Sequence, residues 1–309
     1  MHIRLKRPIL AGLLVAAATV DIGIAGEPVT LETYQEEIQA WRARRVERLK
    51  SPGGYLTLTG LYWLHEGKNS FGTDPLNEIV FPGSKATASL GAFYLEDGRI
   101  RVEVHPGVGV RSGDETVEKM RLYHDQDREH DRTELTLGTL TWYAIKRGER
   151  FAIRLKDSNS EAIRSFGDIE SFSIDTRWRI DGVFDVYDPV RTIPIVSVGN
   201  VSTNEISTGA VVFDIGGKTY RLDVLAEAGD TTLFVIFADG TSGSETYGGG
   251  RFLVVDAPGV DGKVVIDFNK AYNPPCAFSD FTTCPLPPRQ NHLPASVTAG
   301  EKVYKKSKS

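Results

Sequence analysis

Three arginines and four other polar residues form the set with the most suggestive chemistry. The planar guanidinium group of arginine suits two-point contacts with a carboxylate or a phosphate. We take as candidate ligand-binding residues Arg147, Arg154, Arg251, Asp267, Asn269, Tyr272 and Asn273. In this hypothesis Arg251 faces Asp267 or a bound anion. The alternative is structural: Asp267 pairs with an arginine, and the two asparagines hold the backbone of the loop that follows.

Three short patterns that could indicate catalysis do not fit their motifs. The glycine-rich stretch 240–250 is followed at Arg251 by a β pattern, whereas a phosphate-binding loop leads into a helix and carries Lys and Ser/Thr. Gly240 interrupts the Asp-Thr-Gly motif of aspartic proteases after Asp239, and no second copy occurs. Residues 240–244 fail the nucleophile-elbow pattern at Ser244. The catalytic residues therefore stay unknown.

Histidines and carboxylates are crowded between residues 124 and 131. The group is His124, Asp125, Asp127, Glu129, His130 and Asp131. Imidazole and carboxylate can bind a metal together. On an extended or looped backbone, however, such side chains point in several directions, and charge runs are usually solvated. We predict no metal site and no cofactor.

The N-terminus has the pattern of a secretory signal peptide. Arg4, Lys6 and Arg7 precede an apolar run over residues 8–20, and residues 23–25 form a small-x-small cleavage site. The apolar run is too short to span a bilayer comfortably. We predict cleavage after Ala25, no stable membrane span afterwards, and a periplasmic or secreted protein. An uncleaved anchor is the alternative.

Two cysteines, Cys276 and Cys284, are the only ones in the chain. In an exported protein, a pair at short spacing favours a disulfide, and we predict one between them. It would shape a Pro-rich segment that has few ladder hydrogen bonds. Two free, buried thiols are the alternative.

Composition indicates a globular protein and argues against nucleic acid as a partner. Apolar residues make up 40% of the 309 residues and charged residues 25%, which is ordinary for a soluble fold. The net charge is −5, with both signs interspersed along the chain. A surface of this kind attracts polyanions poorly.

Apolar periodicity predicts one helix followed by many short strands. Residues 31–50 place Tyr34, Ile38, Trp41 and Leu49 on one face, with charges such as Arg45 elsewhere. Thr30, or Thr33 with Glu36, would begin this helix.

Beyond residue 55, strands flank hairpin turn signals at residues 97–98, 147–149 and 216–217. Further strands are predicted at residues 55–64, 233–238, 251–256 and 263–268. We predict a mostly β fold, an antiparallel sandwich or barrel with one N-terminal amphipathic helix. A signal peptide (1–25) would precede a single β-rich domain (26–309), with its helix at about 31–50 and its β body at about 55–301.

Several motifs resemble those of one family. These are Gly60–Leu64 with Asn69–Gly72, the glycine-rich stretch 239–253, the run 267–278 with its Asn-Pro-Pro-Cys motif, and residues 283–288. They resemble the DUF1684 proteins, from about Trp41 to Lys302. The resemblance implies no particular activity, because the family has none established.

Three hypotheses for the function follow. The first is an exported protein that binds a small, anionic molecule in a β pocket. The second is a hydrolytic enzyme that uses carboxylates near Asp267. The third is a structural protein of the cell envelope. The first is preferred, since the spacing of residues reveals no nucleophile–base pair.

Overall fold

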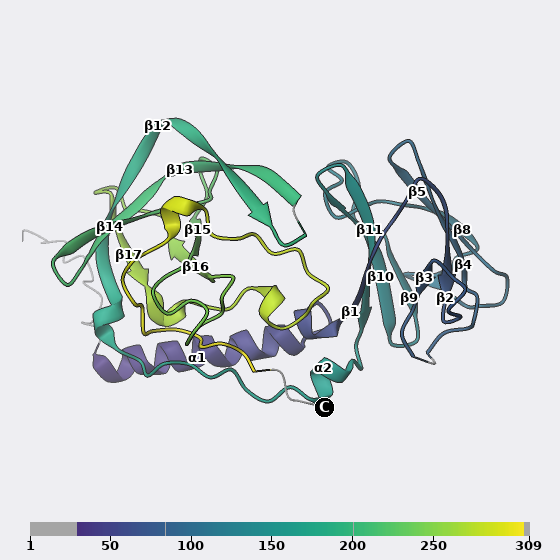
Figure 1. Ribbon diagram of the computed structural model, residues 1–309, viewed down its shortest axis with the longest axis horizontal. Helices are drawn as coiled ribbons and strands as arrows, with labels where there is room; N and C mark the ends of the chain where they lie inside the picture. Colours follow the sequence, from purple (N-terminus) through teal and green to yellow (C-terminus); the bar gives the residue numbers. More distant parts are fainter. Residues whose placement is uncertain (1–29, 84, 200, 306–309) are drawn as a thin grey trace, which may run out of the picture.

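The computed structural model describes residues 30–83, 85–199 and 201–305 (Figure 1). It contains a long helix, α1 (Leu31–Lys50), a short one, α2 (Glu161–Arg164), and many strands. Single turns of 3₁₀ helix lie at Tyr55–Thr57, Thr176–Trp178, Phe268–Lys270, Pro275–Ala277 and Arg289–Asn291. The predicted signal peptide lies outside the described residues. That residues 26–309 form a single domain stays a prediction.

The strands form two groups along the chain. Those of the first β unit are β1 (Leu58–Trp63), β2 (Gly67–Gly72), β3 (Ile79–Val80), β4 (Gly91–Glu96), β5 (Arg99–Val104), β6 (Arg111–Ser112), β7 (Glu115–Thr116), β8 (Lys119–Leu122), β9 (Glu134–Leu137), β10 (Leu140–Arg147) and β11 (Arg150–Asp157). Those of the second β unit are β12 (Arg179–Ser197), β13 (Val201–Ile215), β14 (Lys218–Asp223), β15 (Thr232–Phe237), β16 (Arg251–Asp256) and β17 (Lys263–Asp267).

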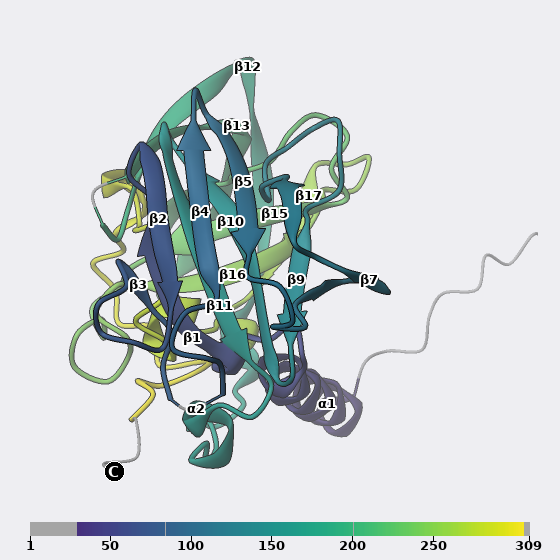
Figure 2. The same ribbon diagram turned by 90° about the vertical axis from the view of Figure 1, so that its right-hand side faces the viewer.

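The first β unit has two sheets around one core. Their strand orders are β1-β11-β10-β9-β6-β7 and β3-β2-β4-β5-β8. Pairing is antiparallel except between β2 and β3. Side chains from both sheets, such as Phe93 and Trp142, share one buried cluster. Figure 2 looks onto this unit, with β2, β4 and β5 in front of β10 and β11.

The second β unit is built on a sheet of order β14-β13-β12-β17 and on the hairpin β15-β16. Its core cluster includes Phe213, Phe237 and Phe268 and is separate from that of the first unit. Helix α1 runs along this unit, and its last turn reaches the start of β1 (Figure 1). The helix therefore belongs mainly to the second unit, although β1 follows it in the chain.

Helix α1 has the predicted bounds, but one of its charged residues is buried. Thr30 is the N-cap, and its side chain accepts a hydrogen bond from the Thr33 backbone N–H at 3.2 Å. The buried positions are Tyr34, Ile38, Arg45 and Leu49, whereas Trp41 is half-buried. The expectation that Arg45 lies away from the apolar face is wrong. Its spacing places it on the packed face, where it forms an ion pair with the buried carboxylate of Glu301.

The mostly β, antiparallel fold is confirmed, and the predicted hairpins form at the turns named above. Two details differ. Residues 55–57 form a 3₁₀ turn before β1, and β12 is a 19-residue strand that the sequence did not suggest. Pro189 and Pro194 lie within this strand. Proline cannot donate a hydrogen bond to a neighbouring strand, so the two residues indicated that no continuous strand forms here. No helix of the described residues has the length and apolar character to cross a membrane.

Candidate functional site

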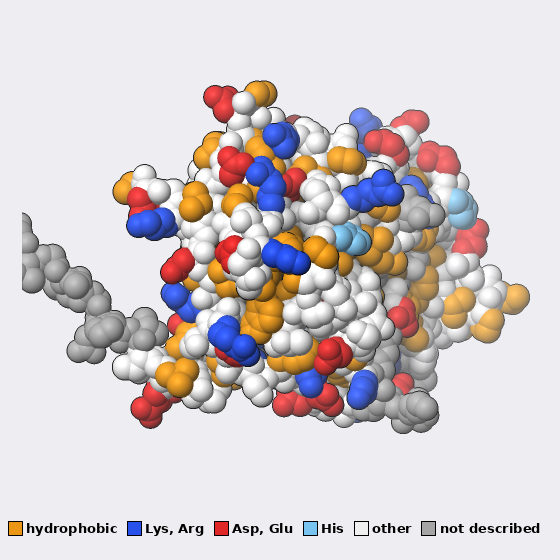
Figure 3. Space-filling view, turned by 60° about the vertical axis from the view of Figure 1, so that its left-hand side comes forward, with side chains coloured by type: hydrophobic (Ala, Val, Ile, Leu, Met, Phe, Trp, Pro, Cys, Tyr) orange, Lys and Arg blue, Asp and Glu red, His pale blue; other side chains and the backbone are white. Residues whose placement is uncertain are grey.

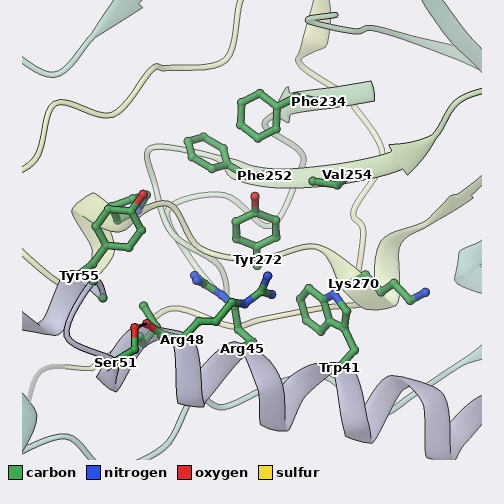
Figure 4. A pocket seen from close by; sticks show the side chains of 14 residues that line it. Trp41, Arg45, Arg48, Ser51, Tyr55, Phe234, Phe252, Val254, Lys270 and Tyr272 are labelled. Atoms are coloured by element: carbon green, nitrogen blue, oxygen red, sulfur yellow. Dashed lines mark hydrogen bonds between the residues drawn. The ribbon is translucent and has the colours of Figure 1, made fainter. Parts of the chain in front are cut away.

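A pocket lies between α1 and the hairpin β15-β16 (Figure 4). Its volume is about 710 Å³, within the range typical of small-molecule sites. The second half of α1 forms one side, and the segment 270–275 forms another. The lining residues are Trp41, Arg45, Arg48, Leu49, Ser51, Gly53, Gly54, Tyr55, Phe234, Phe252, Val254, Lys270, Tyr272 and Pro275.

Five aromatic rings give the pocket an apolar wall. The rings of Phe234 and Phe252 meet edge to face at 5.0 Å, and those of Phe252 and Tyr272 at 5.8 Å. Trp41 of α1 lies 6.2 Å from Tyr272. Backbone hydrogen bonds in both directions join Phe252 to Tyr272 and fix the segment 270–275 beside β16. The wall is thus held by both ring packing and main chain.

Three cations line the pocket, but two already have partners. Arg45 pairs with Glu301 at 3.2 Å and lies over the Tyr272 ring at 4.7 Å. Lys270 pairs with Glu37 at 2.6 Å. Arg48 is exposed and has no carboxylate partner within the described part of the chain. Figure 4 shows its side chain beside that of Arg45, below Tyr272.

The charged side chains among the described lining residues are all cations, and none of these residues is Asp or Glu. Burial raises the pKa of Tyr272, so its hydroxyl stays protonated and can donate a hydrogen bond. The hydroxyl has no hydrogen-bond partner among the described residues. An arginine and a phenol hydroxyl are therefore both available to a ligand.

The turn that ends α1 shapes the rim of the pocket. Ser51 caps the helix, and the Gly54 N–H returns to the Ser51 carbonyl at 2.7 Å. A Cβ on Gly54 would lie 2.2 Å from the Leu49 carbonyl oxygen, so only glycine fits here. Ser51, Gly53 and Gly54, which follow the helix, thus also form the pocket edge.

Asp267 and Asn269 lie in a buried network that fastens the start of α1. The Tyr34 hydroxyl donates to Asp267 Oδ1 at 2.9 Å, and the Asn269 backbone N–H donates to the same atom at 3.0 Å. Asn269 Nδ2 also donates to the Tyr34 hydroxyl at 2.9 Å and to the Asp175 carbonyl at 2.9 Å. Burial and the nearby Asp267 carboxylate raise the pKa of Tyr34. Both residues hold structure here and do not line the pocket.

Arg251 is fully buried, and its ion-pair partner is Asp239 at 3.2 Å rather than Asp267. Its guanidinium also donates to the carbonyl oxygens of Val297 and Ala299. Arg251 therefore joins β16 to the C-terminal segment. The predicted pairing with Asp267 is wrong, because the Arg251 side chain points to the end of β15, where Asp239 lies.

Asn273 binds the C-terminal segment as well. Its backbone N–H donates to Glu301 Oε2 at 2.7 Å, and its amide nitrogen donates to the Lys302 carbonyl at 2.7 Å. Its Oδ1 atom is buried without a partner among the described residues. Burial raises the pKa of Glu301, whereas the nearby Arg45 opposes this shift.

Arg147 and Arg154 belong to strands of the first β unit and do not line the pocket. Arg147 pairs with Asp125 at 2.8 Å and donates to Thr283 Oγ1 at 3.3 Å. Arg154 on β11 is buried, and its Nε has no hydrogen-bond partner among the described residues. The seven candidate residues thus do not converge on one site, and only Tyr272 lines the pocket.

The other pocket residues escaped the sequence reasoning, although one signal was present. Trp41, Arg45 and Arg48 are spaced by four and three residues, which puts them on one helical face. A tryptophan beside two arginines on such a face is consistent with a binding surface. Phe234 and Phe252 gave no comparable signal, because aromatic residues are ordinary in buried strands.

The crowded segment 124–131 serves local structure. The Asp127 carboxylate accepts backbone hydrogen bonds from Glu129 and His130, each at 3.0 Å. The His130 ring stacks on Tyr123 at 4.0 Å. Among the described residues, no group of three or more His, Cys, Asp or Glu side chains is arranged to hold a metal ion.

Both cysteines are free thiols in the structure, so the predicted disulfide is not formed there. They are nevertheless close neighbours. The Cys276 backbone N–H donates to the Cys284 sulfur at 3.0 Å, and the Cys284 N–H donates to the Cys276 sulfur at 3.3 Å.

Comparison with known proteins places the chain in a family. Residues 164–302 match the family model described as "Protein of unknown function (DUF1684)", and the chain belongs to this family. No curated protein matches the sequence significantly. The solution NMR structure of an uncharacterized protein from Haloarcula marismortui is 32% identical and covers 45% of this chain and 78% of that one, with a TM-score of 0.38.

Proposed function

We propose that this protein binds a small molecule with an aromatic or apolar body and an anionic group. The observation that carries the proposal is the 710 Å³ pocket with five aromatic rings, three cations and no described carboxylate in its lining. The rings would cover the body of the ligand, and Arg48 would meet its anionic group. The Tyr272 hydroxyl would donate a further hydrogen bond.

The surroundings of Asp267 support binding over hydrolysis. A catalytic carboxylate must reach the substrate. The Asp267 carboxylate is instead nearly buried and accepts hydrogen bonds from Tyr34 and Asn269. These contacts hold α1 against the second β unit. The role of the Asp267 carboxylate is therefore structural.

We also propose that the protein acts in the periplasm or outside the cell. The support is the sequence pattern at the N-terminus: basic residues, an apolar run and a small-x-small site at residues 23–25. In an oxidising compartment Cys276 and Cys284 could join as the predicted disulfide. On the face in Figure 3, acidic and basic side chains are interspersed, and neither sign forms a large patch. This supports a small-molecule ligand over a polyanion.

The test is titration calorimetry with two matched probes, 2-naphthoate and neutral 2-naphthylmethanol. The naphthoate should bind more tightly, and added salt should reduce the difference. Arg48→Gln should weaken naphthoate binding by about tenfold, equivalent to about 1.4 kcal/mol. It should leave the alcohol unchanged.

Arg44→Gln is the matched control, because Arg44 lies on the same helix, is exposed and does not line the pocket. It should change neither affinity more than about twofold, well under 1 kcal/mol. Equal affinity for both probes, or equal effects of the two substitutions, would contradict the proposed charge recognition. If neither probe binds, the assignment of the pocket as a binding site is contradicted.

A further inference from the structure

Cys276 and Cys284 lie behind the aromatic wall of the pocket. They share a packed cluster with Phe252, Phe234 and Tyr272. The segment that carries them is held on the other side by the end of β12, where the Val198 N–H donates to the Cys284 carbonyl at 2.9 Å. The two sulfurs are thus fixed near each other by the surrounding fold.

The two cysteines have different environments. Cys276 is half-buried and its sulfur faces three donors: the Cys284 thiol, the Cys284 backbone N–H and the Thr282 hydroxyl at 2.8 Å. Cys284 is buried, and its sulfur lies 3.6 Å from Thr282 Oγ1. The single Thr282 hydroxyl hydrogen is shared with the Ser279 carbonyl at 3.0 Å. More donors point at Cys276, which is also the more accessible of the two.

A buried arginine places a positive charge near Cys276. Arg154 on β11 is buried, and its Nε has no hydrogen-bond partner among the described residues. Its positive charge acts on Cys276. Donation from the Cys284 thiol, with smaller contributions from Thr282, the Cys284 N–H and Arg154, lowers the pKa of Cys276 to about 6. The same contact raises the pKa of Cys284. Tyr247, Asp280 and Tyr272 are titratable groups near the two cysteines.

We propose that Cys276 is a reactive thiolate that reduces a hydroperoxide, and that Cys284 is its resolving partner. The Cys276 sulfur attacks the terminal oxygen of the hydroperoxide, so that an S–O bond forms and the O–O bond breaks. The sulfur is oxidised to a sulfenic acid, and the leaving oxygen takes a proton and departs as water or an alcohol. The protons and electrons of this step balance without a further reactant.

Cys284 then attacks the Cys276 sulfur. An S–S bond forms, the S–O bond breaks, and the hydroxyl leaves as water with the proton of the Cys284 thiol. A dithiol reductant would return the pair to two thiols by exchange. This assignment is independent of ligand binding in the pocket. It gives the predicted disulfide a reversible role in place of a permanent one.

The experiment uses the full chain, first reduced with a dithiol and then treated with hydrogen peroxide. Mass spectrometry should find an intramolecular bridge in the wild type. In Cys284→Ser, dimedone should trap a sulfenic acid at Cys276. Competitive alkylation of the reduced wild type should label Cys276 at least about tenfold faster than Cys284, because a buried protonated thiol reacts slowly.

Two controls separate a reactive site from mere proximity. Thr282→Val should slow the reaction of Cys276, whereas Thr283→Val should not, because the Thr283 hydroxyl contacts Arg147 and neither sulfur. In denaturant both cysteines should react at equal rates, with rates that rise near an ordinary thiol pKa of about 8.5. In the folded protein the rate at Cys276 should rise near pH 6.

The proposal would be overturned by equal labelling of the two cysteines in the folded wild type. It would also be overturned by equal effects of the two threonine substitutions, or by oxidation that yields no bridge. A bridge that resists dithiols would indicate a permanent disulfide. That last result would contradict the redox assignment and leave the proposed export and ligand binding untouched.

Discussion

Replacing Arg45 with methionine should be among the most damaging single changes in helix α1. Arg45 and Glu301 form an ion pair in which both residues are buried. Methionine keeps much of the length of the side chain but leaves the Glu301 charge without its cation. Removing one member of a buried pair costs about 3–5 kcal/mol. The Asn273 carbonyl also loses its donor, so we expect a cost near the upper end of this range.

The cost should depend on pH in a defined direction. Burial already raises the pKa of Glu301, and losing Arg45 should raise it further. A carboxyl whose folded-state pKa is raised gives stability that is present below its unfolded pKa, 4.5, and that is lost as the pH rises through the folded value. The penalty of Arg45→Met should therefore be smaller at pH 5 than at pH 8.

Urea unfolding at both pH values measures this penalty. Arg45→Met combined with Glu301→Gln should recover part of the loss, because it removes the uncompensated charge. The matched control is Arg44→Met on the exposed face of the same helix, with an expected effect within about 0.5 kcal/mol. A penalty for Arg45→Met below about 1 kcal/mol, or one equal at both pH values, would refute the reasoning.

Three further outcomes are expected. Tyr34→Phe should destabilise the protein by about 1–3 kcal/mol in urea unfolding, because the buried Asp267 carboxylate loses its hydroxyl donor; no change would contradict the buried network. Gly300→Ala should cost more than Gly262→Ala: both glycines have positive φ, but a Cβ at Gly300 would lie 2.4 Å from the Ala271 carbonyl oxygen and one at Gly262 meets nothing within 4 Å. N-terminal sequencing of the exported protein should begin at Gly26, and an intact start on protein retained in the cytoplasm would contradict export.

Local signals predicted much of the fold. Asp97-Gly98 and Gly216-Gly217 each join two antiparallel strands, because positive φ is needed in such turns and glycine supplies it. The helix followed from apolar spacing and a threonine cap. The long strand β12 did not, because its ladder to β13 and β17 overrides the local effect of its prolines.

The candidate site was much harder to predict, since it depends on contacts between distant segments. Trp41 and Phe252 line one pocket although more than half of the chain separates them. Arg251 and Asp267 lie close in sequence but do not pair with each other. Arg251 forms an ion pair with Asp239, and Asp267 accepts a hydrogen bond from Tyr34. Residue type correctly indicated that these charged groups are paired inside the protein. It could not indicate with which partner.

Helix α1 links the stability of the protein to the formation of its pocket. Tyr34 and Ile38 dock the helix, Trp41 and Arg48 line the pocket, and Arg45 and Leu49 do both. A ligand that touches α1 and β16 together can bind only when the helix is docked. It therefore adds its binding free energy to helix docking, about 2.7 kcal/mol at a concentration 100 times its dissociation constant. Ligand should accordingly protect the backbone amides of α1 from hydrogen exchange more than those of the first β unit, whose core is separate. Equal protection of α1 and the first β unit would mean that ligand binding is not coupled to helix docking.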